Sequence, residues 1–429
     1  MAFRYNKIYP QSTPLPITLL TTGINGVFEF NISAGTTFNL SKSLLNISLK
    51  INALASRYPI ISGTLSQFIN RIQLVNSNNQ ILTDINDAYS YSTQTILQCN
   101  SKCGFKRSQI YSTQTTQIIA NQNTIYNINK IKEAELTGAD AELADQDSVG
   151  LYLQGSDVNQ TVFFSYASDF KFMYPKTIFS LDKNIHTKEN LKIYITLNPA
   201  DLFAYFGTSP GDYQKTNSIP NLTSSITNFY INLYTTPSIE DTNFTVNCIE
   251  PEIQKIIVTS KLIHNVRTML KPNKDIGFIT WSPYSSGYQT GSEMFGNSMN
   301  DCNRNNVARQ AIKSYDLRLS GNPLIQNQPI DCIAQEHILV NMLHYHDSLL
   351  TTGNINSTIN LLGFVNYTTF DGRGIYDFDP NNTSYLSTEI PLELTNDVVL
   401  DGADTKSHQF VIGYKKTIKS ENGFLSVVV

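Results

Sequence analysis

The fold class follows from a stretch in the first half of the chain, Leu191-Lys192-Ile193-Tyr194-Ile195-Thr196-Leu197, in which apolar and polar residues alternate without interruption. Successive side chains of a β-strand point to opposite faces of a sheet, so this period of two predicts a strand with one buried face and one wet face. Other short segments, bounded by Gly, Asn, Pro or Ser, show the same alternation: 27–32, 45–51, 229–234, 315–319 and 408–414. The sequence therefore predicts antiparallel sheets packed as sandwiches.

The composition agrees with an all-β protein of two domains. Charged residues make up only 15% of the chain, which contains 23 Tyr and 22 Phe, a mixture suited to half-buried strands joined by polar loops. The length of 429 residues exceeds the roughly 250–300 residues at which a single hydrophobic core stops growing. We expect a linker between Pro237 and Pro251, and domains at 1–245 and 246–429.

An internal similarity suggests that the two domains share a topology. Residues 72–82 and 315–325 each read as a strand, a turn with Ser-Asn or Gly-Asn, and two apolar residues. We expect a short helical insertion after each, one following Asp84 and one from Gln328 to Leu350, where apolar residues recur at helical spacing. The acidic segment from Lys132 to Gly150 lacks an apolar stripe and is predicted to be an exposed loop.

Charge and hydropathy exclude several classes of protein. A net charge of -4 gives no general field for attracting nucleic acid or anionic lipid. The N-terminus lacks the apolar stretch of a signal peptide, and no run approaches the roughly 20 apolar residues of a membrane span. We expect a soluble protein made in a cytoplasm. Its five scattered cysteines are expected to be free thiols: Cys99, Cys103, Cys248, Cys302 and Cys332.

Candidate metal ligands are sparse. His344 and His346 flank Tyr345 and precede Asp347, but residues two apart on a helix point to different sides and could not share a metal there, although they could on a strand. Cys99 and Cys103 would form half of a zinc site, and no second pair has a matching spacing. We therefore predict no metal-binding residue and read these side chains as ordinary surface or core groups.

Catalytic and phosphate-binding signatures are also missing. There is no G-x-S-x-G, G-x-x-x-x-G-K-[ST], H-E-x-x-H or G-x-G-x-x-G segment, although carboxylate pairs that meet only in space stay open. The stretches 371–374 and 401–404 read as turns rather than calcium sites. Small basic clusters at Lys102, Lys106 and Arg107 and at Lys415-Lys416 read as solvated faces, with a local patch for a membrane or genome as the alternative. We predict no catalytic residue, no cofactor-binding residue and no cofactor.

Three segments carry a resemblance to a known family. Residues 63–74 are similar to an early strand-entry segment, 225–234 to the closing strand of a first jelly roll, and 407–429 to the closing strands of a second. With two tandem sandwiches and a helix inserted in each, the chain resembles the double jelly-roll major capsid proteins of icosahedral viruses, the PRD1/adenovirus-like lineage. The resemblance has no diagnostic motif but spans nearly the whole chain.

The resemblance implies an all-β fold of two tandem antiparallel jelly-roll sandwiches and a structural role in a virion. The expected partners are two further copies in a homotrimeric, pseudo-hexagonal capsomer, neighbouring capsomers, penton or minor capsid proteins, and an internal membrane at the inner face. No sequence-specific contact with nucleic acid is expected, and assembly would take place in the host cytoplasm. A viral receptor-binding or fibre protein is the alternative, but it should show short repeats or a stalk-like segment. A jelly-roll carbohydrate enzyme would need clustered acids and aromatic residues in a groove.

Overall fold

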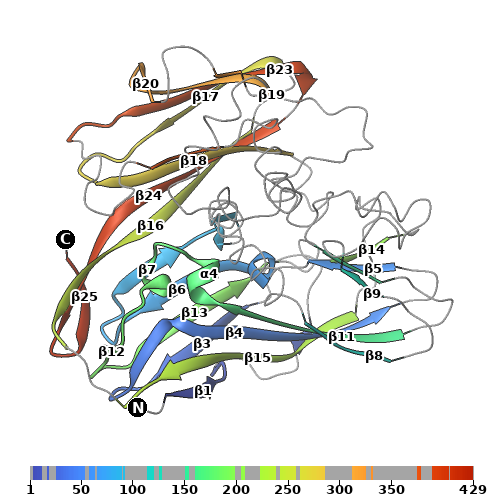
Figure 1. Cartoon of the computed structure of the whole chain (residues 1–429), viewed down its shortest axis with the longest axis vertical. Helices are drawn as coiled ribbons and strands as arrows, with labels where there is room; N and C mark the ends of the chain where they lie inside the picture. The colour runs from blue at the N-terminus through green and yellow to red at the C-terminus, as the bar shows by residue number, and fades with distance from the viewer. Residues whose placement is uncertain are drawn as a thin grey trace, which may run out of the picture.

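A computed structural model gives the structure of the chain. It describes residues 3–11, 17–18, 26–53, 58–62, 65–88, 90–91, 114–119, 125–127, 150–153, 160–198, 204–207, 223–237, 242–257, 261–285, 312–324, 330–331, 374–377, 389–404 and 406–428. Nearly all regular structure in these ranges is β-strand, as Figure 1 shows. Within them no helix is long and apolar enough to cross a bilayer.

The first part of the chain forms three antiparallel sheets. Sheet A has the order β1-β15-β4-β11-β8, with β12 added to β4 and β2 added to β15. Its strands are β1 (Arg4–Ile8), β2 (Ile17–Thr18), β4 (Thr37–Ala53), β8 (Gln114–Ile119), β11 (Gln160–Asp169), β12 (Ile185–His186) and β15 (Thr223–Thr235). Sheet B has the order β3 (Val27–Ile32), β13 (Leu191–Leu197), β6 (Ile69–Val75) and β7 (Ile81–Ile85). Sheet C comprises β14 (Ala204–Gly207), β5 (Tyr58–Ser62), β10 (Gly150–Leu153) and β9 (Ile125–Asn127).

The remaining strands form two further antiparallel sheets. Sheet D has the order β16 (Phe244–Ile257), β24 (Lys406–Glu421), β18 (Ile276–Ser285) and β22 (Gly374–Asp377), and β25 (Phe424–Val428) pairs with β24. Sheet E has the order β17 (Lys261–Met269), β23 (Glu393–Asp404), β19 (Ile312–Leu319) and β20 (Asn322–Pro323), and β21 (Ile330–Asp331) pairs with β19. Short helices with described bounds include η1 (Leu65–Phe68), α4 (Phe170–Met173) and η3 (Ile178–Ser180).

Sheets A and B pack face to face as the first sandwich. The alternation predicted for residues 191–197 is present in β13, whose apolar residues are buried while the residues between them stay half-exposed. Phe28 and Phe30 of sheet B meet Phe229 of sheet A edge to face, with ring centroids 4.9 and 5.2 Å apart. Edge-to-face packing of this kind is a favourable geometry for aromatic pairs and holds the two sheets in register.

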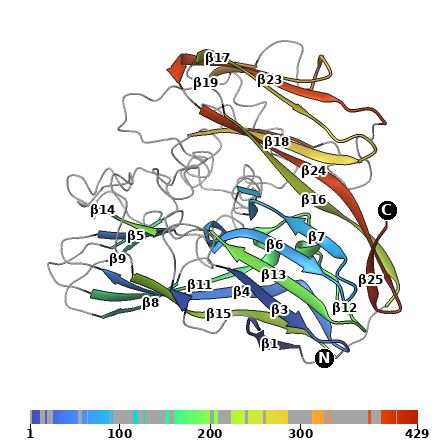
Figure 2. The same ribbon diagram turned by 180° about the vertical axis from the view of Figure 1, so that it is seen from behind.

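Sheets D and E form a second sandwich, and sheet D also packs on the first. Ile412 of β24 belongs to the core between sheets D and E, whereas Val411 beside it belongs to the core of the first sandwich. Both faces of sheet D are therefore buried over this stretch, and the four sheets stack in the order A, B, D, E (Figures 1 and 2). The prediction of one wet face was wrong for residues 408–414, all of which are buried.

A second feature of β24 depends on a residue without a side chain. The ring of Phe278 lies against Gly413, and a Cβ built on that glycine would come within 2.5 Å of the ring. A glycine at this position thus lets neighbouring strand β18 place an aromatic ring over β24.

Two local predictions need correction. Ile330 and Asp331 were predicted to begin a helix, but they pair with β19 as strand β21, because the free side of β19 offers ladder hydrogen bonds. The rest of that predicted helix lies outside the described residues. Residues 401–404 were predicted to form a turn, but they extend β23, and the ladder with β17 reaches Asp404. After β7, by contrast, Ala88, Ser90 and Tyr91 are helical, as predicted.

Candidate functional site

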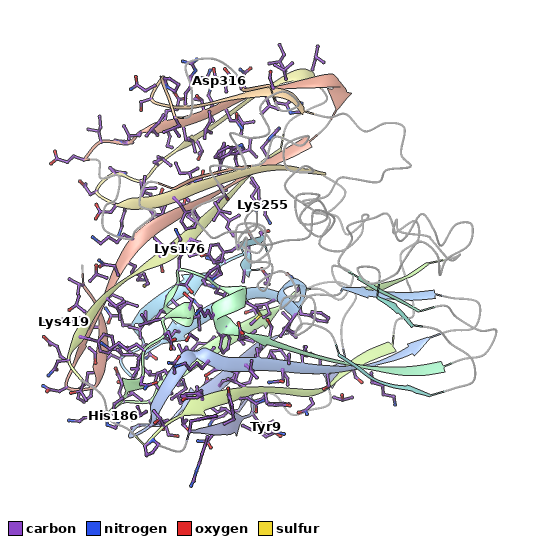
Figure 3. All side chains as sticks on the ribbon, in the orientation of Figure 1. Tyr9, Lys176, His186, Lys255, Asp316 and Lys419 are labelled. Atoms are coloured by element: carbon purple, nitrogen blue, oxygen red, sulfur yellow. The ribbon has the colours of Figure 1, made fainter. Side chains whose placement is uncertain are left out.

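A groove of about 570 Å³ lies where the two sandwiches meet. Asp84 and Asn86 line it from the first sandwich, and residues of β16, β24, β25 and the β17–β18 turn line it from the second. Lys176 and Lys255 mark the junction of the sandwiches in Figure 3. The ammonium group of Lys255 lies 3.2 Å from the carboxylate of Asp87 and so joins the two sandwiches directly.

Opposite charges balance along this groove. Four lysines and four acidic residues line it, and most of them pair with one another. Lys416 Nζ lies 2.6 Å from Glu250 Oε1, and Lys415 Nζ lies 3.3 Å from Asp275 Oδ2. The basic cluster predicted at Lys415-Lys416 is thus neutralised by its neighbours, so it presents no field to a membrane or genome.

The groove also lacks the groups of a catalytic site. No Cys, His or Ser stands among the described residues that line it. The hydroxyl of Tyr414 accepts a hydrogen bond from the backbone N–H of Lys271 at 3.0 Å, and burial raises the pKa of Tyr414 above its usual value. The charge of nearby Glu252, which pairs with Lys271, raises this pKa further, so the phenol stays neutral and hydrogen-bonded as a structural group.

A buried carboxylate joins the sandwiches at the end of the hairpin formed by β24 and β25 (residues 406–428), which we call the C-terminal hairpin. Glu189 is 5% exposed. Its Oε1 accepts the N–H of Leu425 at 2.7 Å, and its Oε2 accepts the N–H and hydroxyl of Ser77 at 3.1 and 2.5 Å. The turn after β6 adds a bond from Asn76 Nδ2 to the carbonyl of Leu425 at 2.9 Å. Burial of the charge is tolerable because hydrogen bonds surround it.

The turn of this hairpin fits against the first sandwich. Asn422 and Gly423 both have positive φ angles, 54° and 87°, which is the geometry of the tight turns that Asn-Gly favours. The N–H of Lys188 donates to the carbonyl of Gly423 at 2.9 Å. A Cβ at Gly423 would lie only 3.0–3.2 Å from atoms of Lys188 and His186, so glycine serves both the turn and the close approach.

Two buried histidines connect sheets D and E. His264 Nδ1 and His408 Nε2 lie 2.9 Å apart, and the side chains are 1% and 4% exposed. One of the two nitrogens must donate a proton to the other. No group of three or more potential metal ligands occurs in the described ranges. The pair therefore acts as a polar link inside the second sandwich.

Sequence reasoning did not find this histidine pair or the role of Glu189. The two histidines are 144 residues apart, and nothing in a single sequence couples them. The one signal for a buried histidine is its position on β17. His264 is two residues from buried Val266 and therefore shares the inward face of the strand with it, while the residues on either side of His264 are exposed. The contacts of Glu189 likewise come from segments far away in the chain.

Of the predicted free thiols, Cys248 lies in the described residues. It is buried on β16, and its Sγ donates to the carbonyl of Lys416 at 3.4 Å. Burial raises the pKa of its thiol to about 12, which makes it a poor nucleophile. Other candidates lie outside the described residues: Cys99, Cys103, Cys302, Cys332, His344, His346, Asp347, Lys102, Lys106, Arg107 and the acidic segment before Gly150.

The surface of sheet A that faces away from sheet B, which we call its outer face, carries a cluster of aromatic rings. Phe3 stacks on Tyr234 at 5.3 Å between centroids, and Tyr5 meets the same ring edge to face at 5.7 Å. Lys7 Nζ lies 4.8 Å from the ring centre of Tyr230. The cluster presents several large rings to solvent, which is typical of a protein interface.

The arrangement defines a class of protein: two antiparallel β-sandwiches in tandem, sharing a buried middle sheet. No protein-family model and no curated protein matches the chain. Among solved structures, it is similar to a chain of the Sputnik virophage determined by cryo-EM, with 10% identity and a TM-score of 0.59 over 100% of this chain and 88% of that one.

Two further structures have the same fold. The mavirus major capsid protein is 10% identical, with a TM-score of 0.52 over 99% of this chain and 90% of its own. The PBCV-1 protein VP54, fitted into a reconstruction of Sputnik, is 9% identical, with a TM-score of 0.51 over 100% and 97%. These neighbours are major capsid proteins of double jelly-roll viruses. The chain therefore has the double jelly-roll fold, and the predicted fold class is confirmed.

Proposed function

We propose that the chain is a major capsid protein that builds the shell of an icosahedral virus. The observation that carries the proposal is the double sandwich itself, which aligns with capsid proteins over 99–100% of the chain. The packing of sheet D on the first sandwich supports it, because this contact holds the two sandwiches together as one block that could tile a surface. The balanced groove and the inert Cys248 are consistent with a structural protein, and we propose that it catalyses no reaction.

The finer features of the proposal concern assembly. Two sandwiches of similar topology, placed at 1–245 and 246–429, would give six quasi-equivalent units in a trimer, and therefore a pseudo-hexagonal capsomer. Neighbouring capsomers and penton or minor capsid proteins would contact the trimer, and an internal membrane would lie at the inner face. The protein would reside in the virion capsid after assembly in the host cytoplasm.

Mass measurement and imaging test the proposal. The purified chain should have three times the 48.1 kDa mass of one copy, and cryo-EM of the native particle should show pseudo-hexagonal capsomers in the shell. A stable monomer that occurs singly in the particle would contradict it. Labelling that places the chain at the tips of fibres would support an attachment protein instead.

A further inference from the structure

The N-terminal strand β1 forms an edge of sheet A that the described part of the chain leaves open. β1 pairs with β15 alone among the described strands. In Figures 1 and 2 it lies at the rim of the molecule, below β15. Its open side carries backbone donors and acceptors that can extend the sheet with another strand.

The side chains on β1 separate into two faces. Ile8 packs against the core of the first sandwich. Alternate residues of a strand share a face, so Arg4 and Asn6 lie on the same core side as Ile8. Tyr5 and Lys7 lie on the outer face, where Tyr5 is opposite Tyr234 and Lys7 is opposite Asn232. Tyr9, labelled in Figure 3, follows on that face. Its ring contacts that of Tyr230, with centroids 5.7 Å apart.

Three aromatic side chains of this segment are exposed to an unusual degree. Phe3 is 58%, Tyr5 48% and Tyr9 49% exposed. Ring contacts with Tyr234 and Tyr230 already hold them in place, so covering them would cost little further conformational entropy. Phe3 covers a face of the Tyr234 ring, and Lys7 covers a face of the Tyr230 ring. These two tyrosines therefore present edges and hydroxyls, which do not form a surface on which nucleic-acid bases could stack.

We propose that this open edge pairs with the same edge of a second copy of the chain, antiparallel and about a two-fold axis centred on Asn6. In that register Phe3 lies opposite Tyr9 of the second copy, and Tyr5 lies opposite Lys7. Each exposed ring thereby meets a ring or a cation, and no charge faces a like charge directly. All three exposed aromatic side chains gain a partner in one step.

Neighbouring registers are poorer. A shift by two residues in one direction places Lys7 opposite Lys7, and a shift by two in the other places Tyr5 opposite Tyr5 and leaves Tyr9 beyond the paired segment. Lysine at an open edge ordinarily opposes such pairing. Here the centred register turns each Lys7 toward a tyrosine ring, as it already is toward Tyr230 within one copy.

The contact is expected to be weak between isolated molecules and to matter in an assembly. Seven residues bury less than the roughly 1,000 Å² of a stable interface, so many copies held in one particle would be needed to maintain it. In this respect the inference rests on the proposed capsid function. It then identifies β1 as a contact that joins chains across a two-fold axis.

Site-directed disulfide formation tests the pairing in the full-length protein. In the centred register the two copies of residue 6 have Cα atoms about 4.5–5.5 Å apart, within the range that a disulfide spans. Asn6→Cys should therefore form a linked dimer on mild oxidation at high protein concentration, identified by mass spectrometry. The matched control is Arg4→Cys, whose two copies lie about 14 Å apart in this register and should not link.

Charge provides a second, independent readout. Lys7→Glu in the Asn6→Cys background removes two cation–ring contacts between the copies and should lower the yield of linked dimer by about 5- to 30-fold. The melting temperature should fall only by the small amount expected from loss of the exposed contact between Lys7 and Tyr230 within one copy. The two Lys7 side chains lie diagonally across the paired strands, about 7–8 Å apart, and repel each other. Added salt screens this repulsion and should raise the yield of linked dimer. Binding to anionic vesicles or single-stranded nucleic acid would weaken with salt instead.

Three results would overturn the pairing: no link through residue 6, equal links through residues 4 and 6, or binding of the segment to vesicles or nucleic acid that Lys7→Glu abolishes. If trimers and particles still form in that case, the capsid function stands and only the β1 contact is wrong.

Discussion

Replacing Glu189 by Ala should loosen the C-terminal hairpin from the first sandwich. The carboxylate accepts three hydrogen bonds, and the N–H of Leu425, which is buried, has Glu189 Oε1 as its partner at 2.7 Å. Leaving that donor unsatisfied costs about 1–3 kcal/mol, and loss of the charge-assisted bonds to Ser77 adds to it. We expect the free energy of unfolding to fall by about 3–5 kcal/mol, because three hydrogen bonds to a charged group, each worth about 1.5–3 kcal/mol, are lost while the cost of burying the carboxylate is recovered.

Urea unfolding gives the free energy, and hydrogen exchange at the amide of Leu425 locates the change. The matched control is Glu421→Ala in the same hairpin, because Glu421 is exposed and pairs only with Lys419 in the described structure, so its loss should change stability by less than about 1 kcal/mol. If Glu189→Ala lowers the free energy of unfolding no more than the control does, or if the Leu425 amide remains protected from hydrogen exchange, then Glu189 does not hold the sandwiches together.

Three further changes have defined outcomes. Cys248, whose thiol pKa burial raises to about 12, should resist iodoacetamide at pH 8 until urea unfolds the chain, and rapid labelling of the folded protein would show that β16 opens. Gly413→Ala places a methyl group against the ring of Phe278 and should cost about 1–3 kcal/mol in urea unfolding, whereas unchanged stability would mean that the ring moves freely. Lys42 lowers the pKa of Asp182, so this carboxylate stabilises the fold above its unfolded pKa of about 3.9, and that contribution is lost as the pH falls through the lower folded value. The Asp182→Asn variant should therefore show a flatter fall in melting temperature below pH 4, and a profile parallel to the unmodified protein would contradict the assignment.

The alternation of side chains was enough to predict the strands and the sandwich class. β13 shows why, since each of its polar residues is half-exposed and each apolar one is buried. The same rule failed at residues 408–414, because a strand between two cores has no wet face. Phe410, Val411 and Ile412 form an uninterrupted apolar run there, and that run was the available sign of a strand buried on both sides.

Contacts that join distant segments were out of reach. Glu189 looks like an ordinary polar residue until the turn at Ser77 and the hairpin at Leu425 come together around it. Strand β21 is two residues long and is extended because it forms backbone hydrogen bonds with β19. The β-propensity of the local sequence does not contain information about this distant partner. The Asn422-Gly423 turn, by contrast, carries the strongest short-range signal for a hairpin and was readable from sequence.

The shared middle sheet also sets an order of events during synthesis. β16 and β18 precede their central neighbour β24 by well over a hundred residues, so a growing chain carries them without the strand that fills the space between them. The first sandwich can close early on the ribosome, while one side of it stays uncovered until β24 arrives. A chain released before that point would display this apolar side, so complete folding depends on translation through β24.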